Sequence, residues 1–150
     1  GRLPVYSELK HYLNRDGSTK AEIVGGNLSI LLSLAGSNLD LQTKGKILFI
    51  EDVGEKLYHL DRMMQNLKIS GKLEKLKGLI VGTFTEIQDG KTPFGKSAEE
   101  IIFDVVKEYN YPLIFGFQSG HIPNCKALIF GMKAQMKVKK GVGLINYLTA

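Results

Sequence analysis

Lys46-Ile-Leu-Phe-Ile50 is a short and almost wholly apolar run, which is typical of a strand covered on both faces by other layers. Two runs of the same kind follow at residues 78–84 and 113–117. Apolar residues at helical spacing predict a helix over residues 55–69, and a capping-box sequence predicts a second helix over residues 97–109. Strands that alternate with helices in this way indicate an α/β fold with a small, partly parallel sheet and flanking helices.

The N-terminal part of the chain has weaker patterns. Residues 1–20 are polar and irregular, and we interpret them as a linker-like segment before a domain that covers residues 21–150. Residues 21–24 predict a short strand that ends at a tight turn of Gly25 and Gly26. Asn27 then has the side chain of a good N-cap for a helix that Gly36 ends.

The C-terminal part predicts antiparallel strands. Residues 127–130 form one short apolar run, and residues 133–139 and 143–148 form a C-terminal antiparallel hairpin around a Lys-Gly-containing turn. Residues 133–139 alternate strictly between a basic or polar residue and an apolar residue. Such a row of lysines is typical of the solvated side of a strand, and lysines also protect a sheet edge from pairing.

Composition and charge exclude several classes of protein. The 150 residues are 43% hydrophobic and 23% charged, which indicates an ordinary globular domain. A single cysteine, Cys125, excludes internal disulfides and a Cys-based zinc site. The longest apolar stretch, residues 28–35, is far shorter than the ~20 residues of a membrane span. The chain opens Gly-Arg-Leu-Pro without an initiator Met, so we expect it to be a piece of a longer protein.

The net charge of the chain is +5. This whole excess of positive charge lies in residues 109–150, which hold five lysines and no acidic residue. A noncatalytic basic binding module is therefore one interpretation. Proteins that bind single-stranded nucleic acid stack bases on aromatic side chains placed among basic residues. No aromatic residues alternate with these lysines, so we expect no nucleic-acid partner.

Two titratable residues follow predicted parallel strands. Glu51 comes directly after the run at residues 46–50, and His121 comes four residues after Phe117. Because reactive groups gather beyond the carboxyl ends of parallel strands, we expect Glu51 and His121 to lie close together. A carboxylate that holds a histidine makes it a general base and then a general acid. Asp52 is the competing carboxylate, although strand alternation predicts that it points to the opposite side from Glu51.

A nucleophile that would complete this pair is missing from the sequence. No Gly-x-Ser-x-Gly motif occurs. Ser29 and Ser33 lie on an apolar helix, Ser97 is a cap, and Ser119 is only two residues from His121. Cys125 could form a Cys–His pair with His121, but we interpret it as a small apolar packing residue.

Four motifs carry a resemblance to a known family. In order and in spacing, the chain resembles the LD-carboxypeptidases, serine peptidases related to the microcin C self-immunity proteins, from about Leu13 to its C-terminus. The motifs are Gly25-Gly-Asn-Leu-Ser29, Ile47-Leu-Phe-Ile-Glu-Asp-Val-Gly54, Tyr58-His-Leu-Asp-Arg-Met63 and Phe115-Gly-Phe-Gln-Ser-Gly-His121.

The resemblance implies a Ser-Glu-His triad divided between two domains. Glu51 and His121 fall on the family's catalytic Glu and His, in a C-terminal domain of swivelling β/β/α architecture. The nucleophile belongs to an N-terminal domain that lies outside this chain, so the chain alone is expected to be inactive. The implied partners are that N-terminal domain, a second copy in a homodimer, and a murein peptide as substrate.

The resemblance also implies the reaction and its setting. The intact enzyme is expected to release the terminal D-alanine of murein tetrapeptides during cell-wall recycling, in the cytoplasm, without a metal or an organic cofactor. The related immunity proteins leave a second possibility open, which is hydrolysis of a microcin-like aminoacyl nucleotide by the same triad.

Overall fold

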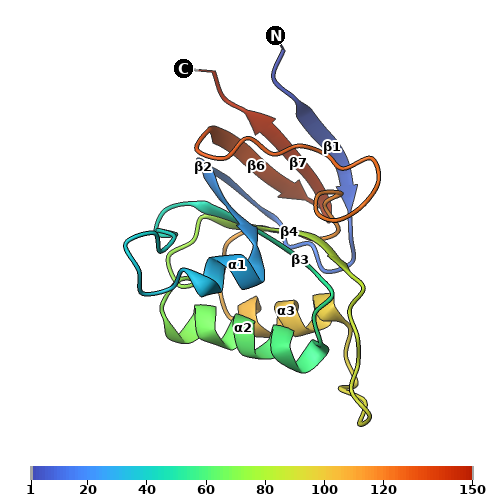
Figure 1. The fold of residues 1–150 in the computed structure, drawn as a ribbon. Helices are drawn as coiled ribbons and strands as arrows, with labels where there is room; N and C mark the ends of the chain where they lie inside the picture. The colour runs from blue at the N-terminus through green and yellow to red at the C-terminus, as the bar shows by residue number, and fades with distance from the viewer. Residues whose placement is uncertain (1, 150) are drawn as a thin grey trace.

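The computed structural model describes residues 2–149 as one mixed sheet with helices packed against part of it (Figure 1). The mixed α/β class and the partly parallel sheet predicted from the sequence are confirmed. In the part of the chain described, no helix is both long and apolar enough to cross a lipid bilayer. The strands are β1 Val5–Lys10, β2 Gly17–Asn27, β3 Ile47–Val53, β4 Gly78–Thr85, β5 Leu113–Ile114, β6 Lys133–Lys139 and β7 Val142–Tyr147, and the helices are α1 Leu28–Ser33, α2 Leu57–Ile69 and α3 Ala98–Val106.

The strand β2 joins the two halves of the sheet, whose order is β1-β7-β6-β2-β3-β4-β5. Residues 17–22 of β2 pair antiparallel with β6, and residues 23–27 pair parallel with β3. β3, β4 and β5 continue the parallel half, while β6, β7 and β1 form the antiparallel half. Figure 1 shows the antiparallel half at the top and the helices beneath the parallel half.

The apolar run that opens β3 faces two separate cores. Leu48 and Ile50 belong to the core that α2 and α3 cover, and Ile47 and Phe49 belong to a second core against the antiparallel half of the sheet. Both faces of β3 are therefore buried, which explains why its sequence is continuously apolar rather than alternating.

Residues 1–20 were interpreted as linker-like, and for residues 5–10 and 17–20 this interpretation is wrong, while Gly1 lies outside the described residues. Val5–Lys10 form the edge strand β1, which pairs with β7, and β2 begins at Gly17. The signal was absent from the sequence because β1 is largely exposed and its pairing is interrupted between Tyr6 and Leu9, so no regular alternation results.

Other boundaries changed in ways that have local causes. Residues 127–130 form no strand and run as a loop, because tyrosine side chains rather than a backbone ladder hold this segment: the Tyr6 hydroxyl donates to Ala127 O, and the Tyr147 hydroxyl accepts from Ile129 N. Met136 and its apolar neighbours on β6 are buried and the lysines exposed, as the alternation predicts. However, β6 lies between β7 and β2, so its lysines do not protect an edge.

The predicted starts of α1 and α3 are confirmed, whereas α2 begins at Leu57, two residues later than predicted. The Asn27 side chain accepts a hydrogen bond from Ile30 N and caps α1. Ser97 and Glu100 form the predicted reciprocal capping box of α3, which ends at Val106, earlier than the sequence indicates. The predicted tight turn at Gly25 and Gly26 is wrong, because both residues belong to β2.

Candidate active site

Glu51 lies within β3, near the end of the sheet where the parallel strands finish. Its backbone is paired with Asn27, the last residue of β2. Alternation along the strand directs its side chain to the same face as Phe49, towards the antiparallel half of the sheet. Only 9% of the Glu51 side chain is exposed, so its carboxylate requires a polar partner.

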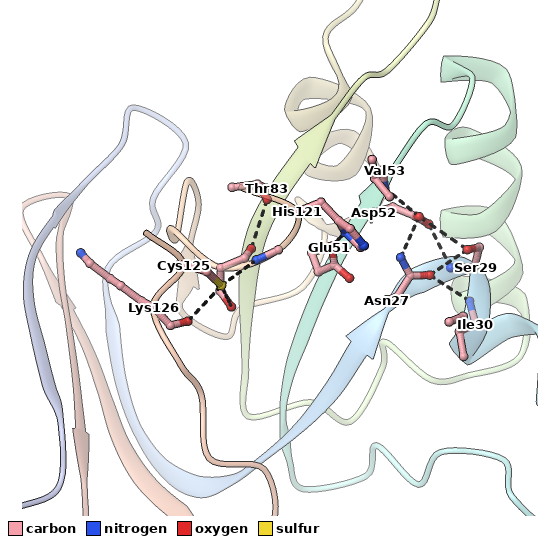
Figure 2. A network of polar contacts seen from close by, with 12 residues as sticks. Asn27, Ser29, Ile30, Glu51, Asp52, Val53, Thr83, His121, Cys125 and Lys126 are labelled. Carbon is pink, nitrogen blue, oxygen red and sulfur yellow. Dashed lines mark hydrogen bonds and ion pairs between the residues drawn. The ribbon is translucent and has the colours of Figure 1, made fainter. Parts of the chain in front are cut away.

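His121 supplies that partner. It lies in the loop after β5, and its Nδ1 is 3.0 Å from Glu51 Oε2 (Figure 2). The His121 side chain is 55% exposed, in contrast to the buried carboxylate. The structure therefore brings together the acid and the imidazole that the sequence analysis singled out, across 70 positions of the chain.

This geometry determines what the imidazole can do. An ionised carboxylate only accepts hydrogen bonds, so His121 Nδ1 carries the proton and donates it to Glu51. The lone pair is then on Nε2, which makes no hydrogen bond to any of residues 2–149. A neutral imidazole held in this tautomer can remove a proton from an incoming hydroxyl, and the buried carboxylate stabilises the imidazolium that forms.

The side chain of Asp52 lies on the opposite face of β3 from that of Glu51. It is 1% exposed, and its carboxylate accepts hydrogen bonds from Asn27 Nδ2 at 2.9 Å, Ser29 N at 3.0 Å and Val53 N at 2.9 Å. Figure 2 shows this group of contacts beside the Glu51–His121 pair. The Asp52 carboxylate thus fixes the start of α1 against β3, and it makes no hydrogen bond or ion pair with His121.

Replacing Asp52 with alanine should destabilise the fold. Three donors would lose their acceptor inside the protein, so we expect the free energy of unfolding to fall by about 2–4 kcal/mol. Asp104→Ala is the control, because Asp104 is ion-paired with Lys96 and Lys107 at the surface and such pairs contribute little. Denaturant unfolding of both variants measures the difference, and equal losses would contradict this account.

The loop after His121 is held by residues from the antiparallel half of the sheet. Tyr6 of β1 donates a hydrogen bond to Ala127 O, and the Tyr147 hydroxyl of β7 accepts one from Ile129 N at 2.8 Å. Burial raises the pKa of both tyrosines, so both hydroxyls stay protonated at neutral pH. The N-terminal strand that the sequence analysis missed therefore helps to shape the site.

A shallow hollow of about 310 Å³ adjoins the Glu51–His121 pair. Cys125 lies in its wall and is exposed, so the interpretation of Cys125 as a small apolar packing residue is wrong. Its sulfur accepts a hydrogen bond from Gly120 N at 3.4 Å and belongs to the same loop as His121. The remaining lining is mostly apolar or small: Gly26, Phe49, Ser119, Gly120, Leu128 and Phe130.

The model of the LD-carboxypeptidase C-terminal domain matches residues 20–136. The chain belongs to the LD-carboxypeptidase family. The resemblance found in the four sequence motifs is thereby confirmed.

Individual proteins that are similar to this LD-carboxypeptidase domain support the same family. A probable murein peptide carboxypeptidase of Bacillus subtilis is 36% identical over 130 residues, which are 87% of this chain and 41% of that protein. The microcin C7 self-immunity protein of Escherichia coli is 26% identical over 78% of this chain and 34% of its own length. The crystal structure of a muramoyltetrapeptide carboxypeptidase from Oxalobacter formigenes superposes with a TM-score of 0.86 at 27% identity, and covers 97% of this chain and 50% of that one. The chain thus spans about two fifths of the length of the curated carboxypeptidase it matches.

The serines of the LD-carboxypeptidase domain have other contacts. Ser29 Oγ donates to Asn27 Oδ1 at 2.8 Å, Ser33 Oγ donates to Ile30 O, and Ser97 caps α3. Ser119 is buried, and its hydroxyl lies 3.6 Å from Cys125 Sγ. Within residues 2–149, no serine hydroxyl makes a hydrogen bond to His121.

The other two histidines make separate contacts. His59 Nδ1 lies 2.5 Å from Glu55 Oε2 on the surface of α2. His11 stacks on Phe115, and its Nε2 is 3.3 Å from Glu99 Oε2. Among residues 2–149, no three His, Cys, Asp or Glu side chains are grouped so that they could hold a metal ion.

Proposed function

We propose that this chain is the C-terminal half of a serine-type LD-carboxypeptidase that releases the terminal D-alanine of murein tetrapeptides. The observation that carries the proposal is the 3.0 Å contact between Glu51 Oε2 and His121 Nδ1, which leaves Nε2 available at the surface. Family membership and the match to a murein peptide carboxypeptidase support the substrate class.

The chemistry is acyl transfer in two steps. His121 Nε2 removes the proton of a serine hydroxyl that the other part of the protein supplies, and the serine oxygen attacks the carbonyl carbon of the L,D amide bond. The same nitrogen then gives this proton to the departing amine of D-alanine, and the C–N bond breaks. Water hydrolyses the acyl-enzyme with His121 again as base, which restores the serine.

Glu51 and the rest of this chain orient the base. Glu51 holds the Nδ1–H tautomer of His121 and offsets the positive charge that develops on the ring. The oxyanion donors belong to the part of the protein that carries the serine. The reaction uses no metal and no organic cofactor, and the proposed setting is a cytoplasmic homodimer.

A second substrate class is proposed as the alternative. The relationship to the microcin C7 self-immunity protein favours an aminoacyl-nucleotide conjugate as substrate for the same triad. The greater identity to the murein peptide carboxypeptidase makes murein tetrapeptide the first choice.

Assays of the full-length enzyme separate these substrates. We expect release of D-alanine from a murein tetrapeptide, and much slower hydrolysis of an aminoacyl-nucleotide conjugate. The chain of residues 1–150 alone should release no D-alanine, because its serines do not reach His121. Rapid cleavage of the nucleotide conjugate with an intact tetrapeptide would replace the first proposal by the second.

A further inference from the structure

The strand β4 carries an irregularity directly beside Glu51. In the pairing of β3 with β4, Ile50 faces Val81 but Asp52 faces Phe84. The two residues between them on β4, Gly82 and Thr83, therefore face the single residue Glu51. An extra residue of this kind redirects the side chains around it, and such bulges are frequent next to active sites.

The extra residue brings β4 into contact with the loop that carries His121. Ser119 O accepts hydrogen bonds from Thr83 N at 2.9 Å and from Thr83 Oγ1 at 3.2 Å. The approach is close, because a Cβ atom on Gly82 would lie 2.5 Å from Ser119 O. Glycine at position 82 thus allows the loop backbone to lie directly on the strand.

The Thr83 hydroxyl also lies next to the residue between Ser119 and His121. A Cβ atom on Gly120 would lie 2.2 Å from Thr83 Oγ1 and 3.0 Å from Glu51 Oε2. The Thr83 hydroxyl and the Glu51 carboxylate therefore both lie close to the Gly120 backbone. In Figure 2, Thr83 and Cys125 lie on one side of the Glu51–His121 pair, and Asp52 and Asn27 lie on the other.

We propose that Thr83 is a positioning residue for the general base: its hydroxyl holds the Ser119 carbonyl so that the His121 ring stays in hydrogen-bond reach of Glu51. This inference rests on the proposed function, since it assigns a task within the same site. Thr83 donates to the loop backbone and acts on the reaction only through His121.

Three substitutions in the full-length enzyme test this role. Thr83→Val keeps the shape of the side chain and removes the hydroxyl donor, and Thr83→Ala removes the hydroxyl in a smaller side chain, while the backbone donor Thr83 N remains in both. Thr83→Ser keeps the hydroxyl. Thr85→Val is the matched control, because Thr85 is on the same strand and its buried Oγ1 has no hydrogen-bond partner among residues 2–149.

For Thr83→Val and Thr83→Ala we expect kcat to fall about threefold to tenfold, as for the loss of one hydrogen bond that orients a catalytic group. KM for the tetrapeptide should stay unchanged, because Thr83 makes no proposed contact with substrate. Thr83→Ser should recover most of kcat, and Thr85→Val should match the parent. The downfield proton resonance of the His121–Glu51 hydrogen bond should broaden or vanish in Thr83→Val and return in Thr83→Ser.

An unchanged kcat in both Thr83→Val and Thr83→Ala would overturn the inference, as would a loss that Thr83→Ser does not recover. A rise in KM at constant kcat would also overturn it, by showing a substrate contact instead. The proposed function fails separately: it requires that substitution of His121 or Glu51 lower kcat by orders of magnitude, whatever the effect of the Thr83 substitutions.

Discussion

Replacing His121 with alanine in the full-length enzyme should lower kcat by about six orders of magnitude, the loss expected when the base of a triad is removed. The side chain is 55% exposed, so little packing is lost and the melting temperature should stay close to that of the parent. Steady-state release of D-alanine measures the effect. Activity within tenfold of the parent would contradict the assignment.

Glu51→Gln tests the other member of the Glu51–His121 pair. Glutamine has nearly the same shape, but it lacks the charge that stabilises the imidazolium, and its amide can present a donor to Nδ1. We expect kcat to fall by about two to four orders of magnitude. His59→Ala is a matched control, because His59 is also paired with a carboxylate, that of Glu55, on the surface of α2.

Replacing Gly25 with alanine should have the largest effect on the fold. A Cβ atom at this position would lie 1.9 Å from Phe49 O and 2.8 Å from Phe49 N, which are backbone atoms of the neighbouring strand β3. The φ angle of +139° is also unfavourable for any residue with a side chain. Because neither strand can give way without losing its pairing, we expect a loss of about 4 kcal/mol or more, or no folded protein.

Gly26→Ala is the control for this prediction. Gly26 has a similar φ of +150°, but a Cβ atom there would meet no atom within 4 Å. Its substitution should cost only the backbone strain, about 1–2 kcal/mol. Denaturant unfolding or the yield of folded protein compares the two variants, and equal stability of both would show that the contact between β2 and β3 is not as close as described.

Much of the parallel half of the sheet could be predicted because its signals are local. Continuous apolar runs identified β3 and β4, and side-chain caps identified the starts of α1 and α3. These features depend on a few neighbouring residues, such as Asn27 and Ile30, so their signals can be recognised within a short stretch of sequence. The alternation of exposed and buried residues on β6 is another local signal of this kind.

The strand β1 and the loop 122–131 could not be predicted in this way. Tyr6 contacts Ala127 across 121 positions of the chain, and no pattern within residues 1–20 reports such a partner. Cys125 was misjudged for the same reason, because its exposure depends on how the loop is tied to Tyr6 and Tyr147.

For the candidate site, the order of residues after each strand already identified Glu51 and His121, and the four motifs identified the family. Only the tertiary structure decided that the two side chains meet at 3.0 Å, that Asp52 is used on the other face of β3, and that Thr83 lies against the loop of His121. The physical reason is that residue types and periodicity determine local conformation and which faces are buried. Contacts between loops distant in sequence arise only when the packed sheet brings its strand ends together.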